Sequence, residues 1–137
     1  MTWERVYTVN DYHDCPRFGV ADFEGVPHIY ESWFDETADD YTREFRLVRI
    51  APDLLALVLE DWQLWLRWRR AYLAGEVPAA QEHPALPADR ERRDQLRALI
   101  ADRFTARTEG AVKMHARFRG KDENREVEWL PVPPISS

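Results

Sequence analysis

Apolar positions recur every three or four residues from Asp53 to Gly75, a spacing typical of an amphipathic helix. Pro52 and Asp53 suit the first turn, where proline's fixed φ is tolerated and a carboxylate is favoured. Gly75 suits the end, because glycine readily adopts the left-handed cap conformation. The predicted buried face comprises Leu54, Val58, Trp62, Trp65, Tyr72 and Leu73. The pattern therefore predicts one helix of roughly 30 Å, at about 1.5 Å per residue.

Two charged residues, Asp61 and Arg69, fall inside the wide apolar arc of this helix. An ion on a buried face costs free energy unless it is paired. The two residues are about two turns apart, too far for a direct i,i+4 pair, so each is expected to find a partner elsewhere in the fold. A structural role is favoured over a ligand role. The margins of the arc are Leu55, Leu59, Leu66 and Trp68.

Side chains alternate between two faces along residues 17–34, which predicts a β-hairpin with Glu24 and Gly25 at the turn. A two-residue loop would place Ala21 opposite His28 and Gly19 opposite Tyr30, so that Tyr30 covers the bare backbone of Gly19. We expect His28, Tyr30 and Ser32 to form the more hydrated face. Glu31 shares the other face with Phe18, Val20, Ile29 and Trp33, and Arg69 is its predicted partner.

Similar patterns predict strands at 3–9 and 42–50, a second helix at 87–107, and a C-terminal hairpin from 112–119 and 126–129. In that hairpin, basic positions of the first strand face acidic positions of the second. The predicted fold is α+β: a mainly antiparallel sheet of five or six strands packed against the long helix, with the second helix at the surface. Residues 1–130 are expected to form one domain, and 131–137 a flexible proline-rich tail.

Composition narrows the classes of partner. The chain has 137 residues, 45% hydrophobic and 32% charged, with a formal net charge of -6, which disfavours nucleic acid and anionic membranes. Cys15 is the single cysteine, so an intramolecular disulfide is excluded. The N-terminal sequence lacks the apolar core of a signal peptide, and no apolar run reaches membrane-span length, so a cytoplasmic location is expected. Basic residues that are nearly all arginine indicate a bacterial source.

Candidate chemistry is sparse. His13, Asp14 and Cys15 offer the residue types of a nucleophile, a base and an orienting group, but neighbours on an extended chain point apart, so a polar turn is favoured. The acidic segment 35–40 lacks the spacing of a calcium loop and is interpreted as a solvated loop. The sequence also lacks the common hydrolase, phosphate-loop and dinucleotide motifs. We therefore predict no catalytic residues, no metal site and no cofactor.

Three functional hypotheses follow. The first is a noncatalytic interaction or regulatory module, of the inhibitor or immunity type, that presents an acidic and aromatic surface with Tyr12, Trp33 and Trp68 as candidate anchors. The second is a small-molecule binding domain or hydrolase with a cleft between sheet and helix. Its candidate polar site comprises His28, Tyr30, Glu31, Asp61 and Arg69. The third is self-association through the apolar arc of the long helix.

Overall fold

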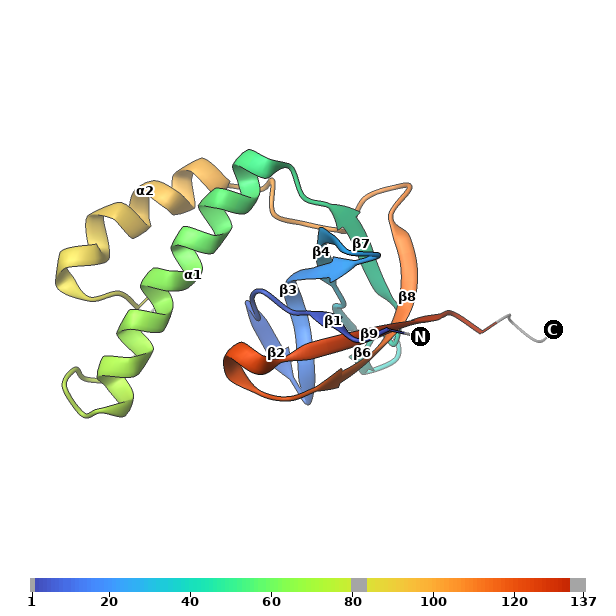
Figure 1. Ribbon diagram of the computed structural model, residues 1–137, viewed down its shortest axis with the longest axis horizontal. Helices are drawn as coiled ribbons and strands as arrows, with labels where there is room; N and C mark the ends of the chain where they lie inside the picture. The colour runs from blue at the N-terminus through green and yellow to red at the C-terminus, as the bar shows by residue number, and fades with distance from the viewer. Residues whose placement is uncertain (1, 80–83, 134–137) are drawn as a thin grey trace. The chain divides into compact units, whose positions relative to one another are not determined.

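The computed structural model describes residues 2–79 and 84–133 (Figure 1). The chain forms two compact units, which are described one at a time: a sheet unit from residues 1–50 and 105–137, and a helical unit from Ala51–Phe104. The single domain at 1–130 and the packing of the long helix on the sheet stay predictions. Of the predicted tail, residues 134–137 lie outside the described residues.

The sheet unit contains an antiparallel sheet of seven strands in the order β1-β9-β8-β7-β4-β3-β2. The strands are β1 (Glu4–Arg5), β2 (Asp11–His13), β3 (Cys15–Phe23), β4 (Val26–Glu31), β7 (Phe45–Arg49), β8 (Val112–Arg119) and β9 (Glu126–Pro131). A separate two-stranded sheet pairs β5 (Phe34–Asp35) with β6 (Asp40–Tyr41). The α+β class is confirmed, but the main sheet has more strands than the five or six predicted, because segment 11–13 pairs with β3 instead of forming a loop.

The sheet is curled, so that β1 and the residues that follow it lie beside β3 (Figure 1). Val6 forms an isolated bridge with Ala21, and the amide of Tyr7 donates to the carbonyl of Val20 at 2.8 Å. The amide of Asn10 then donates to the carbonyl of Phe18 at 2.7 Å. These bonds satisfy backbone groups that an open edge would leave unpaired.

Tyr30 lies in the core of the curled sheet and is completely buried. Its ring centroid lies 6.0–6.2 Å from those of Phe45, Phe118 and Trp129. Its hydroxyl donates to the carbonyl of Thr8 at 2.8 Å. Burial raises the pKa of Tyr30 well above its usual value of 10.0, because the ionised form would lose its hydration. The buried residues of this core are Val6, Ala21, Tyr30, Phe45, Leu47, Val127 and Trp129.

The β3–β4 hairpin has the predicted register, with Phe23 opposite Val26 and Gly19 opposite Tyr30. A Cβ atom on Gly19 would lie 2.2 Å from the carbonyl oxygen of Thr8 and 2.8 Å from the Tyr30 hydroxyl. The prediction that Tyr30 covers Gly19 is therefore confirmed.

The prediction of a hydrated face on β4 was wrong. Only 8% of His28, 0% of Tyr30 and 3% of Ser32 is exposed. Side chains of β3 and β4 alternate in the predicted register, but the curled sheet encloses Tyr30 in its core. This curl depends on contacts between strands distant in sequence, which a single hairpin does not specify.

The C-terminal hairpin of β8 and β9 agrees with its prediction. Arg117 lies opposite Glu128 and Arg119 opposite Glu126. The guanidinium of Arg119 lies 3.0 Å from the Glu126 carboxylate, and that of Arg117 lies 3.7 Å from Glu128. The basic strand therefore faces the acidic strand as expected.

In the helical unit, α1 (Pro52–Leu73) confirms the long helix, and Gly75 has the expected positive φ of 75°. Its buried residues are Leu54, Val58, Leu64 and Trp68. The prediction that Tyr72 and Leu73 belong to the buried face was wrong, because they are 41% and 69% exposed. The buried stripe follows Leu64 and Trp68 in the second half of the helix, which leaves the last turn exposed.

The second helix is shorter than predicted. A 3-10 turn, η1 (Pro87–Asp89), leads into α2 (Arg90–Ile100), and Ala101 ends the helix with a φ of 46°. Residues 105–107, predicted to be helical, instead belong to the sheet unit. With a ψ of -128°, Ala101 lies outside the right-handed helical region, so the chain turns away there.

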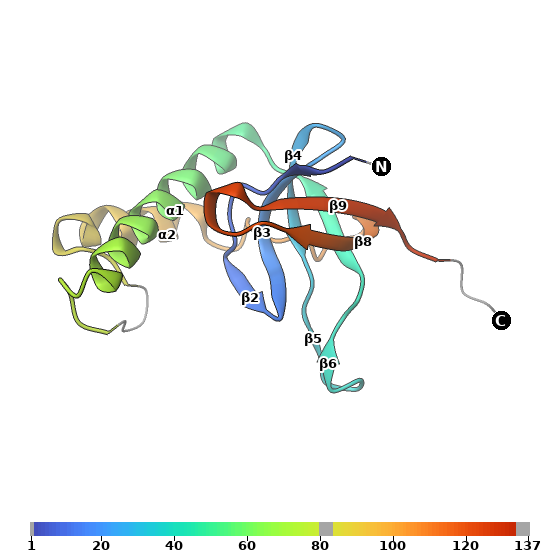
Figure 2. The same cartoon turned by 60° about the horizontal axis from the view of Figure 1, so that its bottom comes forward.

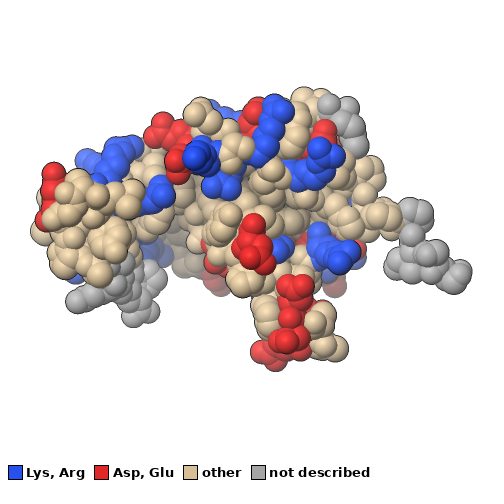
Figure 3. Space-filling model, turned by 90° about the horizontal axis from the view of Figure 1, so that it is seen from below, with Lys and Arg blue, Asp and Glu red and all other residues tan. Residues whose placement is uncertain are grey.

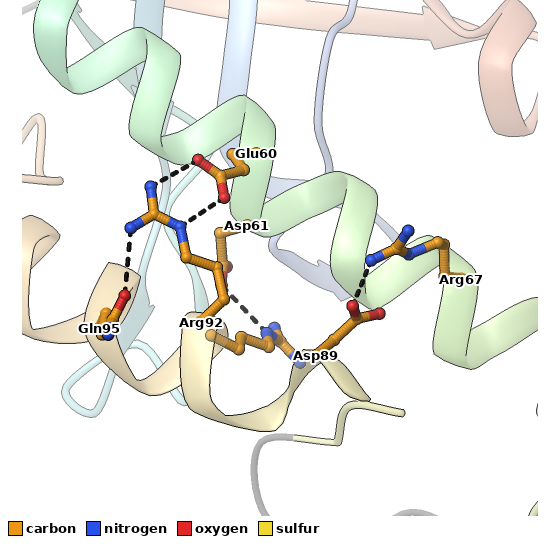
Figure 4. A network of polar contacts seen from close by, with 7 residues as sticks. Glu60, Asp61, Arg67, Asp89, Arg92 and Gln95 are labelled. Atoms are coloured by element: carbon orange, nitrogen blue, oxygen red, sulfur yellow. Dashed lines mark hydrogen bonds and ion pairs between the residues drawn. The ribbon is translucent and has the colours of Figure 1, made fainter. Parts of the chain in front are cut away.

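Ion pairs connect α1 with α2 and η1 (Figure 4). Glu60 accepts bonds from two nitrogens of Arg92 at 2.6 and 2.8 Å, and Arg67 pairs with Asp89. Asp61 accepts a bond from Arg93 at 3.0 Å. The expectation that Asp61 finds a partner distant in sequence is therefore confirmed.

Replacing Arg93 by alanine is expected to lower the free energy of unfolding by about 3 kcal/mol, since removing one partner of a largely buried pair leaves the other charge uncompensated. The side chains of Arg93 and Asp61 are only 11% and 15% exposed. Arg92→Ala is the matched control, and we expect a smaller loss because solvent screens its exposed pair with Glu60. Urea unfolding measures both losses in free energy. Equal losses would contradict the larger contribution assigned to the buried pair of Arg93 with Asp61.

Candidate interaction surface

A short hairpin leaves the main sheet after β4 and returns to it at β7 (Figure 2). We call residues 34–41 the acidic hairpin. Phe34 lies opposite Tyr41 and Asp35 opposite Asp40. The Asp35 carboxylate accepts a hydrogen bond from the amide of Thr37 at 3.0 Å, which braces the turn. The segment interpreted as a solvated loop is thus a paired hairpin, because the side chains of the turn satisfy its backbone amides locally.

Exposed carboxylates and aromatic surface occur together on this hairpin. Glu36, Asp39 and Asp40 are exposed and Asp35 is half-buried. Phe34 is 47% exposed, and its ring meets that of Tyr41 edge-on at 5.7 Å. Figure 3 shows acidic side chains gathered on the projection at the lower edge of that view. The acidic hairpin therefore presents an apolar ring surrounded by negative charge.

Contacts from β2 and β3 hold the base of the acidic hairpin. The Arg17 guanidinium lies 4.7 Å from the ring centroid of Tyr41, and its Nε donates to the carbonyl of His13 at 2.9 Å. Its Nη1 donates to the Ser32 hydroxyl at 3.3 Å. The His13 ring stacks on Tyr41 at 4.8 Å. These contacts fix the hairpin before any partner binds, which reduces the entropy lost on association.

The predicted aromatic anchors have different environments. Tyr12 is 58% exposed on β2, next to His13. Trp33 is half-buried directly before the acidic hairpin. Trp68 is only 8% exposed and stacks on Tyr72 in the helical unit. Trp68 is therefore not an exposed anchor, because its position at the margin of the predicted arc falls within the buried stripe of α1.

The structure adds three residues to the surface that sequence reasoning did not select: Arg17, Phe34 and Tyr41. Phe34 and Tyr41 do border the acidic segment in the sequence, and that position is the signal that could have identified them. Arg17 carried no comparable signal, because its contact with Tyr41 spans distant parts of the chain.

The residues of the predicted polar site are divided between the units, with His28, Tyr30 and Glu31 in the sheet unit and Asp61 and Arg69 in the helical unit. Their shared pocket stays a prediction. His28 Nδ1 donates to the carbonyl of Val26 at 2.7 Å, and its ring meets Phe23 edge-on. The Arg69 guanidinium lies 5.7 Å from the ring centroid of Trp65.

Glu31 has structural partners within the sheet unit. Its Oε1 accepts hydrogen bonds from the Thr105 hydroxyl at 3.0 Å and from the Ala106 amide at 2.9 Å. These bonds fasten segment 105–106 to the end of β4, a contact between residues more than 70 positions apart. Arg69 belongs to the helical unit, so its predicted pairing with Glu31 stays a prediction.

The group at His13, Asp14 and Cys15 does not have the geometry of a nucleophile and its base. The His13 imidazole lies 3.6 Å from the Asp14 carboxylate, while the Cys15 thiol lies 3.6 Å from the carbonyl of Pro16. Burial raises the pKa of Cys15, which favours the less nucleophilic thiol.

Across residues 2–79 and 84–133, no three histidine, cysteine or acidic residues are grouped so that they could bind a metal ion. Within the same ranges, no helix is long and apolar enough to span a membrane.

Comparisons of the chain with protein-family models, with curated proteins and with solved structures found no match.

Proposed function

We propose that this protein is a noncatalytic interaction module whose acidic hairpin docks on a basic surface of a partner protein. The observation that supports this most strongly is the exposure of Phe34 among four acidic residues on a paired hairpin. Inhibitory or regulatory binding is the corresponding activity, because the hairpin offers contact area and charge without a nucleophile. We further propose that the protein acts in the cytoplasm of a bacterium, and that its partner is a protein, not nucleic acid or a membrane.

Binding energy and association rate have separate sources in this proposal. Aromatic side chains commonly supply the energetic centre of protein interfaces. Phe34 occupies that position beside Tyr41, and the exposed Tyr12 on β2 is a further candidate anchor. The carboxylates of the hairpin attract a basic patch over several ångströms and accelerate encounter. The contacts of Arg17 and His13 with Tyr41 hold the hairpin in its bound form.

Affinity capture from the cells that produce the protein tests this proposal. The baits are the wild type, a hairpin variant with Asp35→Asn, Glu36→Gln, Asp39→Asn and Asp40→Asn, and a control with Glu76→Gln, Glu91→Gln, Asp94→Asn and Asp102→Asn. The control removes the same charge from exposed positions of the helical unit.

We expect quantitative mass spectrometry to find one basic protein on the wild-type and control baits that is depleted at least about tenfold on the hairpin bait, a change of about 1.4 kcal/mol. Equal depletion on the control bait would show that only net charge matters. Full retention on the hairpin bait would contradict the proposal.

A further inference from the structure

Three charged residues form a row across the sheet unit, outside the acidic hairpin. Arg46 on β7 lies opposite Glu31 on β4 and opposite Lys113 on β8. Directly opposed residues of antiparallel strands project from the same face, with Cβ atoms about 5 Å apart. The row therefore contains two cations and one carboxylate.

Trp33 brings a third cation to this row. The guanidinium carbon of Arg46 lies 5.2 Å from the centroid of the Trp33 ring, and that of Arg107 lies 4.5 Å from it. Arg107 directly follows Thr105 and Ala106, whose bonds to Glu31 hold this segment beside β4. The carboxylate of Glu31 thus positions the chain that supplies Arg107.

Arginines elsewhere in the molecule, between α1 and α2 and between β8 and β9, pair with carboxylates. Examples are Arg92 with Glu60 and Arg119 with Glu126. In the part of the chain that the structure describes, Arg46, Arg107 and Lys113 form no ion pair. Two of these unpaired cations, Arg46 and Arg107, lie over the Trp33 ring, and Lys113 lies opposite Arg46. Such a group is unusual in a chain of net charge -6.

The Nε atom of Arg46 is buried and has no hydrogen-bond acceptor among the described residues. Its guanidinium is therefore partly dehydrated. A charge in a region of lower dielectric attracts an incoming counter-ion more strongly than a fully hydrated charge does. An anion at the terminal nitrogens would compensate part of the cost of this burial.

We infer that Arg46, Arg107 and Lys113 form a binding site for a small oxyanion, the phosphate or carboxylate group of a ligand. Guanidinium groups match both oxyanions through paired N–H donors, and the lysine ammonium adds a third charge. Trp33 holds the two guanidinium groups in place through its ring face. Trp33 directly precedes the acidic hairpin in the chain, but the site uses other side chains and does not depend on the proposed docking of a basic partner.

Titration of the isotope-labelled protein by NMR tests the inference, with the indole N–H signal of Trp33, assigned by Trp33→Phe, as the reporter. Inorganic phosphate, pyrophosphate and acetate are added separately at constant ionic strength, so the arms distinguish phosphate from carboxylate recognition. We expect a saturable shift with a dissociation constant of about 1 mM or lower for at least one anion.

Arg107→Gln and Arg46→Gln are each expected to weaken that binding about tenfold, whereas Arg97→Gln is the control for net charge. Arg97 is an exposed residue of α2 in the helical unit. Arg107 is exposed, so its variant keeps the test valid should Arg46→Gln fail to fold. A shift that does not saturate below about 10 mM, or equal weakening by Arg97→Gln, would overturn the inference.

Discussion

Replacing Tyr30 by alanine is expected to lower the free energy of unfolding of the sheet unit by about 4 kcal/mol, because deleting a buried aromatic ring removes its contacts and leaves a cavity. The ring is fully buried and lies beside Phe45, Phe118 and Trp129. Urea unfolding followed by near-ultraviolet circular dichroism measures the loss.

Two further variants separate the causes of that loss. Tyr30→Phe keeps the ring but leaves the Thr8 carbonyl without its hydroxyl donor, so we expect a loss of about 1–2 kcal/mol. Tyr12→Ala removes a tyrosine that is 58% exposed, and its stability should change by about 0.5 kcal/mol or less. If Tyr30→Ala were no more destabilising than Tyr12→Ala, the placement of Tyr30 in the core of the curled sheet would be contradicted.

Replacing Phe34 by alanine is expected to weaken binding of the captured basic partner about 100-fold, or roughly 2.7 kcal/mol, because a central aromatic residue commonly dominates interface energy. Surface plasmon resonance with purified proteins measures this change. The ring is 47% exposed, so its removal should leave the fold intact.

Tyr72→Ala is the matched control for Phe34→Ala, since Tyr72 is an aromatic residue that is 41% exposed in the helical unit. We expect it to bind the partner as the wild type does. Binding by Phe34→Ala that equals wild-type binding would exclude Phe34 as the anchor. Equal losses in the two variants would indicate that exposed aromatic area acts without regard to position.

The long helix and the two hairpins were predictable because their signals are local. The period of α1 and its flanking Pro52 and Gly75 lie within one segment. The register of β3 and β4 follows once Glu24 and Gly25 form the turn, since a two-residue loop determines every opposed pair. The charge complementarity of β8 and β9 follows from the same rule.

The direction that each face takes was not predictable from these local signals. Tyr30 is interior because the sheet curls around it, and the curled sheet includes a bridge between Val6 and Ala21, which belong to separate segments. The alternation of β4 is the same whether that face points to water or to the core. Trp68 was predicted at the margin of the apolar arc of the long helix, and it is buried. Whether such a residue is buried depends on which element packs beside it, and the helix sequence alone does not specify that.

The interaction surface was predictable in its composition but not in its assembly. Acidic and aromatic residues are adjacent in the sequence from 34 to 41, which supported the hypothesis of an acidic, aromatic binding surface. The role of Arg17 and His13 in holding Tyr41 depends on β2 folding back along β3. Likewise, Arg46 and Arg107 meet at Trp33 only after separate strands and segments come together.

Hydrogen exchange of the protein with and without its purified basic partner tests the central claim most directly. We expect the partner to slow exchange of amides within residues 34–41, including those of Thr37 and Tyr41, and of the candidate anchor Tyr12. Protection confined to the helical unit, Ala51–Phe104, with unchanged exchange at 34–41, would contradict it.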